Sequence, residues 1–231
     1  MTKPFRHSYL DYHKLIESSI FEGIRICEIG PSGQPSIKSS IIEAKGLDYT
    51  IIDIETAYWE EYNPEVEKFN IDLQRDFDSS LDKKFDLVIS QMVLEHIENP
   101  KNFHEGIFKL LKRGGSAIHL YANPYSIPAI VNGILPESIG SFILSKIKNR
   151  DLDKNHKYPA FYRWCFFPSQ KANRNFESLG YRIVDHMGYP GHNYFQRIPI
   201  LNQLEQLYSW ALCKFNFKKF STLSLLHVKK Q

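Results

Sequence analysis

Cysteine is scarce in this sequence. Cys27, Cys165 and Cys213 are its three cysteines in 231 residues, and they lie far apart. An odd, widely spaced set fits neither a disulfide framework nor the paired spacing of zinc ligands. We therefore expect a reducing, cytoplasmic compartment and no metal site.

Long apolar runs are also missing. No stretch reaches the ~18 consecutive apolar residues that a membrane-spanning helix requires, and the segment from Met1 to His7 leads into polar residues rather than the apolar core of a signal peptide. We therefore expect no transmembrane segment and no secretory signal. Two stretches, 127–148 and 198–220, combine apolar or aromatic residues with lysines, so peripheral contact with a membrane stays open for them.

A strong charge of one sign is absent too. The chain has 29 Lys and Arg against 26 Asp and Glu, a formal charge of +3, and no basic cluster dominates. We therefore expect no nucleic-acid partner, because phosphate binding usually requires clustered Lys and Arg. The 42% apolar and 24% charged residues are typical of an ordinary globular protein.

Short β-rich runs alternate with helical patterns over the first half of the chain. Strands are expected at 24–29, 49–54, 66–71, 85–90 and 116–121, and helices at 9–21, 36–45 and 99–114. This alternation predicts an α/β fold with parallel strands and right-handed crossovers. A helix at 169–179 and strands at 181–187 and 222–228 follow.

We expect a single domain over 1–231, because no repeat or low-complexity tract divides the chain. A leading helix lies in 1–22 and a cofactor-binding half in 23–123. Between 124 and 165, Pro128, Gly133, Pro136 and Gly140 break the alternation, which indicates a lid insertion. Residues 166–231 supply the last strands, with an inserted amphipathic helix at about 198–215.

The turn Glu28-Ile29-Gly30-Pro31-Ser32-Gly33 ends the first expected strand and opens the next helix. Such a turn presents backbone N–H groups to a polar ligand, although any tight strand-to-helix connection also uses glycine. Asp53 ends the second strand, where a carboxylate can accept both hydroxyls of a ribose, and Asp72 follows the third. All three positions lie where open α/β sheets bind ligands.

Taken in order, five motifs resemble those of the class I S-adenosylmethionine-dependent methyltransferases over roughly residues 23–122. They are Cys27–Gly33, Ile51–Ile54, Asn70–Leu73, Phe85–Ile97 and Leu110–Ser116. The resemblance implies a seven-stranded, Rossmann-like sheet with helices on both faces and an antiparallel last strand. It also implies S-adenosyl-L-methionine as the cofactor.

The resemblance assigns roles to particular residues. Glu28 would help hold the methionyl ammonium, Asp53 would bind the ribose, and Asp72 would bind the adenine amino group. The remaining expected cofactor-binding residues are Gly30, Ser32, Gly33, Ile54, Leu73, Ser90 and Gln91. Glu95 and His96 recur in the family pattern, and we interpret them as structural residues on a short helix.

One residue departs from the family pattern. Ser32 stands where the family has glycine, and a Cβ is poorly tolerated there if φ is positive. Since Gly33 follows immediately, the turn can close one residue later.

The reaction implied is an in-line methyl transfer to a small-molecule, sugar or lipid-linked acceptor, in which the protein mainly aligns the acceptor. An oxygen acceptor of high pKa needs a general base, and six histidines are open for that role. They are His96, His104, His119, His156, His186 and His192. Two alternatives are an NAD(P)-dependent oxidoreductase, whose G-x-G-x-x-G fingerprint the turn does not meet, and an inactive methyltransferase-like binding subunit.

Overall fold

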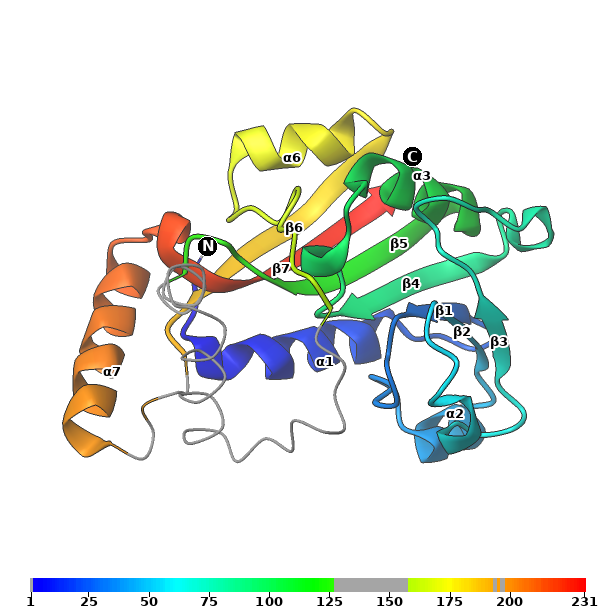
Figure 1. The fold of residues 1–231 in the computed structure, drawn as a ribbon, viewed down its shortest axis with the longest axis horizontal. Helices are drawn as coiled ribbons and strands as arrows, with labels where there is room; N and C mark the ends of the chain where they lie inside the picture. The colour runs from blue at the N-terminus through cyan, green and yellow to red at the C-terminus, as the bar shows by residue number, and fades with distance from the viewer. Residues whose placement is uncertain (1, 127–157, 193–194, 196–197) are drawn as a thin grey trace.

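The computed structural model describes residues 2–126, 158–192, 195 and 198–231, apart from the side chain of Glu61. Its centre is one seven-stranded sheet in the order β3-β2-β1-β4-β5-β7-β6 (Figure 1). The strands are β1 (Arg25–Ile29), β2 (Asp48–Asp53), β3 (Glu67–Asn70), β4 (Phe85–Gln91), β5 (Leu111–Ala122), β6 (Tyr181–Pro190) and β7 (Ser221–Lys230). Because β7 pairs antiparallel with both β5 and β6 while the other pairings are parallel, β7 alone is reversed. The predicted fold is confirmed.

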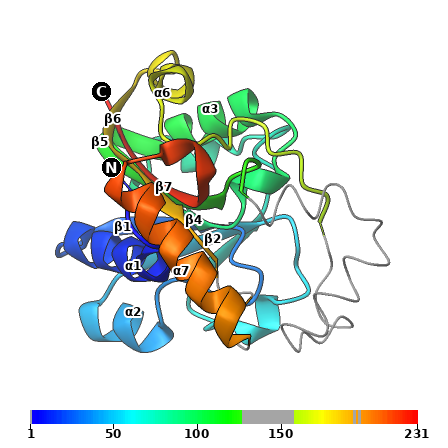
Figure 2. The same ribbon diagram turned by 90° about the vertical axis from the view of Figure 1, so that its left-hand side faces the viewer.

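Helices cover both faces of the sheet, as Figures 1 and 2 show. On one face, α3 (Pro100–Leu110) and α6 (Gln170–Glu177) bury Phe103, Ile107 and Phe176. On the other, α1 (Ser8–Ser19) and α2 (Ser39–Lys45) bury Tyr12, Ile16 and Ile42. Helix α7 (Pro199–Lys214) lies at the outer end of the molecule, beyond β6. None of the helices in the described ranges is long and apolar enough to cross a membrane.

Local sequence signals explain the start of several helices. Asn99 precedes α3 and accepts a hydrogen bond from Asn102 N at 3.3 Å, with Pro100 as the first helical residue. Ser169 caps α6 in the same way through Ala172 N at 3.2 Å. Short 3₁₀ turns lie at Phe5–His7, Trp59–Glu61, Ser79–Leu81, Leu94–His96 and Lys218–Phe220. The turn at Leu94–His96 confirms the expected short helix.

Three expected boundaries were wrong. The helix expected to run through 114 ends at Leu110, because Leu111 already pairs with Phe85 in the sheet. The fifth strand therefore begins at Leu111 rather than at 116. The helix expected from 36 begins at Ser39, because the Ser36 side chain and amide bind Glu28 instead. The expected lid at 124–165 falls largely on 127–157, which lie outside the described residues.

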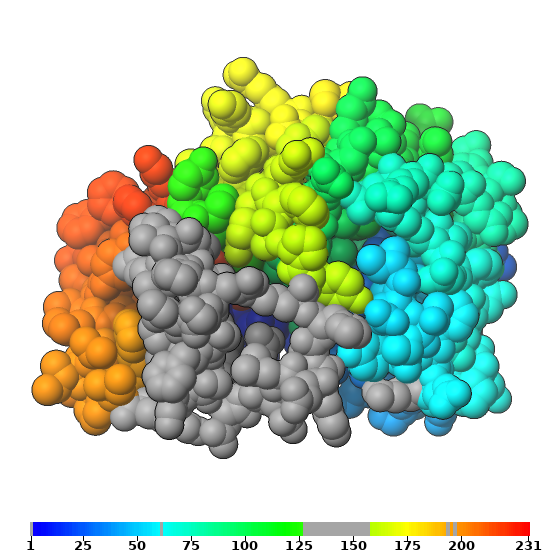
Figure 3. Space-filling model, viewed as in Figure 1, coloured from blue at the N-terminus to red at the C-terminus, as the bar shows by residue number. Residues whose placement is uncertain are grey.

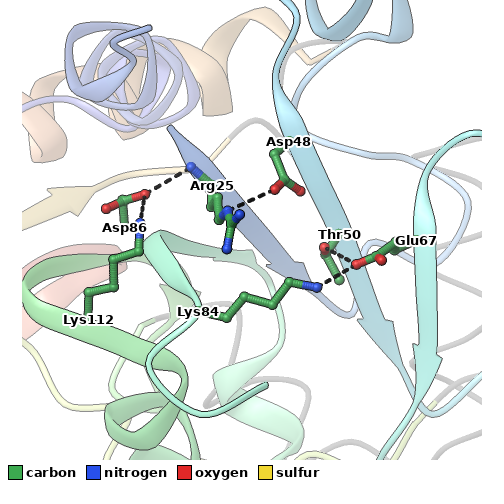
Figure 4. A network of polar contacts seen from close by, with 7 residues as sticks. All are labelled: Arg25, Asp48, Thr50, Glu67, Lys84, Asp86 and Lys112. Carbon is green, nitrogen blue, oxygen red and sulfur yellow. Dashed lines mark hydrogen bonds and ion pairs between the residues drawn. The ribbon is translucent and has the colours of Figure 1, made fainter. Parts of the chain in front are cut away.

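Charged side chains join the amino ends of the central strands (Figure 4). Asp86 Oδ2 accepts from Arg25 N at 3.0 Å and from Lys112 Nζ at 2.7 Å, and Arg25 Nε lies 3.0 Å from Asp48. Lys84 Nζ pairs with Glu67 at 2.7 Å and holds the pKa of that carboxyl below its usual range. Exposed ion pairs of this kind contribute about 0–1 kcal/mol each. The amino ends of the strands are thus held together by structural ion pairs. The candidate functional site lies at the carboxyl ends.

Candidate active site

The turn after β1 contains three residues in the left-handed region. Gly30, Ser32 and Gly33 have φ angles of 64°, 45° and 81°. Ser32 N donates to Asp53 Oδ2 at 3.1 Å and Gly33 N donates to the Tyr62 hydroxyl at 2.7 Å. The departure noted in the sequence is therefore real, because Ser32 adopts a backbone conformation that favours glycine. The hydrogen bond from its backbone N–H to Asp53 helps to hold it there.

Gly30 approaches a neighbouring loop closely. Its N–H donates to Ile52 O at 2.9 Å, which fixes the start of the turn against β2. A Cβ built on Gly30 would lie 2.8 Å from Cγ2 of Val93, in the segment after β4. Both the positive φ and the lack of space therefore call for glycine here.

Asp53 is buried at the end of β2. One carboxylate oxygen accepts from Ser32 N and the other from Glu55 N at 3.0 Å. Burial raises the pKa of Asp53, and the bonds from these amides oppose that shift. The carboxylate thus links the tip of the glycine turn to the segment after β2, and the exposed side chain of Ile54 stands beside it.

Asp72 is half-buried in the segment after β3. Its Oδ1 accepts from the backbone N–H of Gln74 at 3.0 Å and from the side-chain Nε2 of the same residue at 3.2 Å. Its Oδ2 lies 3.4 Å from Arg75 Nε. The next residue, Leu73, is buried. A turn of this kind holds the carboxylate in place while leaving it partly open to solvent.

Glu28 is fully buried and has partners within the chain. Its carboxylate accepts from the backbone N–H of Ser36 at 3.0 Å, and from the hydroxyls of Ser36 and Tyr49. The Tyr12 hydroxyl, on α1, lies 3.2 Å from Ser36 Oγ. Burial raises the pKa of Glu28 to about 7, against the lowering effect of these bonds. Glu28 therefore ties β1 to β2 and to the loop before α2.

A cavity of about 340 Å³ opens at this edge of the sheet. Six of the ten expected cofactor-binding residues line it: Gly30, Ser32, Asp53, Ile54, Asp72 and Leu73. The other four, Glu28, Gly33, Ser90 and Gln91, are not among its lining residues. The structure thus brings together residues from the turn after β1, the end of β2 and the segment after β3.

Ser90, near the end of β4, points into the core. Its hydroxyl lies 2.7 Å from Nδ1 of His119 on β5, and both residues are fully buried. Burial lowers the pKa of His119 to about 3, so this histidine is neutral. The His104 ring, from α3, stands edge-on to His119 and stacks on Trp164. His119 is thus a sheet residue in a buried aromatic cluster.

The family model for the methyltransferase domain matches residues 5–186. The chain belongs to this family. No curated protein matches it. Solved structures with the same fold include an S-adenosylmethionine-dependent methyltransferase from Mesorhizobium loti, with 12% identity, a TM-score of 0.56, and coverage of 94% of this chain and 96% of that one. Another, from Archaeoglobus fulgidus, has 16% identity and a TM-score of 0.55, covering 98% and 96%.

A third similar structure is phosphoethanolamine N-methyltransferase 2 of Haemonchus contortus, in complex with phosphomonomethylethanolamine and S-adenosylhomocysteine. It has 15% identity and a TM-score of 0.55, and the match covers 96% of this chain but 52% of that one. At such identities the likeness establishes the fold. The prediction of a class I S-adenosylmethionine-dependent methyltransferase is confirmed by the family and by this fold, and the oxidoreductase alternative has no support.

The methyltransferase places one of its candidate histidines at the cavity. His96 lines it, and His96 Nδ1 lies 2.9 Å from Pro159 O. The other candidate histidines that the structure describes have different surroundings. His104 and His119 lie in the buried aromatic cluster. His186 is within hydrogen-bond distance of Tyr121 and Asn173, and His192 pairs with Glu205. Burial lowers the pKa of His186 to about 3 and of His192 to about 4. His156 lies outside the described residues.

Sequence reasoning missed part of the cavity wall. Met92, Val93 and Ile97 line it from the segment after β4, and Phe161 lines it from the segment that follows 157. Val93 and Ile97 flank the 3₁₀ turn at Leu94–His96, so no helical spacing in the sequence marked them as neighbours. Nothing local to Phe161 could have indicated its position.

The segment from Tyr158 to Tyr162 lies over the methyltransferase cavity. The amides of Phe161 and Tyr162 donate to Glu95 O at 2.8 and 3.0 Å, and the Tyr158 hydroxyl donates to Glu55 Oε2 at 3.3 Å. In Figure 3 this yellow-green segment lies against the cyan and green surfaces that carry the site. Tyr158 lines the same cavity as Asp53 and Asp72.

Proposed function

We propose that this chain binds S-adenosylmethionine in the cavity at the carboxyl edge of its sheet and transfers the methyl group to a small-molecule, sugar or lipid-linked acceptor. The observation that carries the proposal is the convergence of Gly30, Asp53 and Asp72, from three separate connections, on one cavity. The groups that line this cavity fit a nucleoside. The two carboxylates can accept from hydroxyl and amino groups, and at Gly30, which has no room for a side chain, the backbone can come close to the ligand.

In this proposal Asp53 accepts the ribose hydroxyls and Asp72 accepts the adenine amino group. Ile54 and Leu73, which follow the two acids, offer apolar side chains to the faces of the base. The bound cofactor supplies an electrophilic methyl group on a positively charged sulfur. The backbone N–H of Ser32, at the tip of the turn, donates to Asp53. This hydrogen bond fixes the turn and the ribose-binding acid relative to each other.

Alignment of the acceptor is the main task left to the protein. We infer that Met92, Val93 and Phe161 form an apolar wall that keeps water from the reacting atoms. His96 is the candidate general base for a hydroxyl acceptor. Because a carbonyl can only accept, Nδ1–H of His96 donates to Pro159 O, which leaves the lone pair on Nε2 to take the acceptor's proton.

Calorimetric titration of the full chain with S-adenosylmethionine, S-adenosylhomocysteine and NAD tests the proposal. We expect both sulfur nucleosides to bind and NAD not to bind. Asp53→Ala removes the ribose acceptor and should weaken binding by roughly ten- to a hundredfold, since hydrogen bonds to a charged group contribute about 1.5–3 kcal/mol. Asp48→Ala is the matched control, because Asp48 stands at the other end of the same strand.

Two outcomes would contradict the proposal. Binding of NAD without either sulfur nucleoside would restore the oxidoreductase alternative. Binding of none of the three by a folded chain would favour the inactive binding subunit. Equal affinity of Asp53→Ala and wild type for S-adenosylhomocysteine would remove the ribose assignment and leave the cofactor itself in place.

A further inference from the structure

Helix α7 turns both polar and apolar side chains toward the domain. Ser209 and Leu212 are its buried residues, and Ser209 Oγ donates to Pro190 O at 3.0 Å. Glu205 also faces inward: one carboxylate oxygen accepts from His192 N and the other lies 3.2 Å from His192 Nδ1. The attachment of α7 to the domain thus combines the buried Leu212 with polar contacts of Glu205 and Ser209.

The outward face of α7 is apolar. Ile200, Leu204 and Leu207 follow at intervals of four and three residues, so they form one stripe along the helix. Their exposed fractions are 73%, 58% and 61%, and Trp210 beside them is 55% exposed. This is the reverse of an ordinary surface helix, whose apolar stripe faces the core. Figures 1 and 2 both show α7 at the outer end of the molecule.

The stripe continues past the end of the helix. Phe215, Phe217 and Phe220 are exposed as well. We call these seven side chains the α7 ridge: Ile200, Leu204, Leu207, Trp210, Phe215, Phe217 and Phe220. Single exposed apolar residues are normal on protein surfaces, but so many large ones on one helix and the segment directly after it mark an interaction site.

Charges beside the ridge indicate what it contacts. Lys214, Lys218 and Lys219 lie along its second half, and Lys214 Nζ stands 4.7 Å from the centre of the Trp210 ring. The one acid between 198 and 220 is Glu205, which is turned inward against His192. The surface offered outward therefore combines apolar side chains with positive charge and has no exposed carboxylate of its own.

We propose that the α7 ridge seats this protein on an anionic membrane surface. Apolar and aromatic side chains flanked by lysines are the composition of helices that lie in a lipid interface, and the lysines complement anionic headgroups. A second copy of the chain fits less well, because the one acid between 198 and 220, Glu205, is turned inward, so the ridge of a second copy would offer these lysines no carboxylate. The ridge is made of other residues than the cofactor cavity, so this inference does not depend on the proposed reaction.

Co-sedimentation of the full chain with vesicles tests it, using phosphatidylcholine alone and phosphatidylcholine mixed with phosphatidylserine. We expect binding to the mixed vesicles that weakens as salt rises. Leu204→Gln combined with Leu207→Gln should lower the partition coefficient at least about tenfold. Lys218→Gln combined with Lys219→Gln should lower it roughly tenfold or more, and only for the anionic vesicles.

Phe21→Gln combined with Val184→Gln is the matched control, since both side chains are exposed and lie outside the ridge. It should bind vesicles like wild type, and circular dichroism should show all variants folded. Absence of vesicle binding by wild type would overturn the proposal, as would equal binding by the Leu204 and Leu207 double variant. Concentration-dependent dimers abolished by that double variant, with no vesicle binding, would assign the ridge to self-association instead.

Discussion

Glu95 makes a specific contribution to how stability depends on pH. Its carboxyl is buried, and its Oε2 has no hydrogen-bond partner among the described residues. Burial raises the pKa of Glu95 to about 7, while backbone amides of Glu95 and Ala122 act in the opposite direction. The folded chain thus holds a proton that the unfolded chain, with an ordinary glutamate pKa of 4.5, releases.

The magnitude follows from these two pKa values. Since the folded pKa is the higher one, the stabilising effect is fully present below pH 4.5 and is lost as pH rises to 7. A difference of 2.5 units corresponds to about 3 kcal/mol in total, of which about 2–3 kcal/mol is lost between pH 5 and pH 8. Glu95→Gln keeps the shape and stays neutral, so it removes this dependence.

Urea unfolding of wild type and Glu95→Gln at pH 5 and pH 8 measures the effect. The free energy of unfolding of the variant relative to wild type should rise by about 2–3 kcal/mol from pH 5 to pH 8. Other titrating groups cancel in this comparison because both proteins carry them. Glu105→Gln, at a partly exposed glutamate on α3, is the control and should show no such change. A difference that is constant with pH would refute the account of Glu95.

Three further changes have defined outcomes. Gly30→Ala should lower the free energy of unfolding by about 1–3 kcal/mol in urea, and adding Val93→Ala should recover only the part due to the clash. Tyr49→Phe removes a donor to Glu28 and should destabilise by about 1–3 kcal/mol, more at pH 8, where the carboxyl is ionised, than at pH 5. Equal losses at both pH values would contradict that. With a hydroxyl acceptor, His96→Gln should lower kcat by roughly 10²–10⁴-fold with little change in KM; an unchanged kcat would exclude His96 as the base.

Local patterns were enough to predict the sheet and the positions of two acids. Asp53 ends β2 and Asp72 follows β3, so both acids could be placed at one edge of the sheet by counting parallel strands. The end of α3 could not be found in this way. Lys230, near the end of the chain, donates to Phe108 O at 2.6 Å and to Leu111 O at 2.7 Å, so a distant residue caps the helix where the local sequence would extend it.

In the candidate site, too, local patterns predicted some features, and contacts between distant residues decided the others. The order of motifs placed Glu28 at the start of the turn, but its partners Ser36 and Tyr49 come from other elements that no local pattern connects to it. His96 was interpreted as a structural residue of a short helix and was also one of six candidate bases, and no local pattern indicated its contact with Pro159, 63 residues away. Contacts between segments distant in sequence decide which polar groups are available to a ligand and which are already bound.

The most direct test of the central claim is an experimental structure of the chain with S-adenosylhomocysteine. The ribose hydroxyls should lie within hydrogen-bond distance of Asp53, and the adenine amino group should lie beside Asp72, with the nucleoside in the cavity next to Gly30. A nucleoside bound elsewhere, or bound in this cavity with its ribose away from Asp53, would contradict the account.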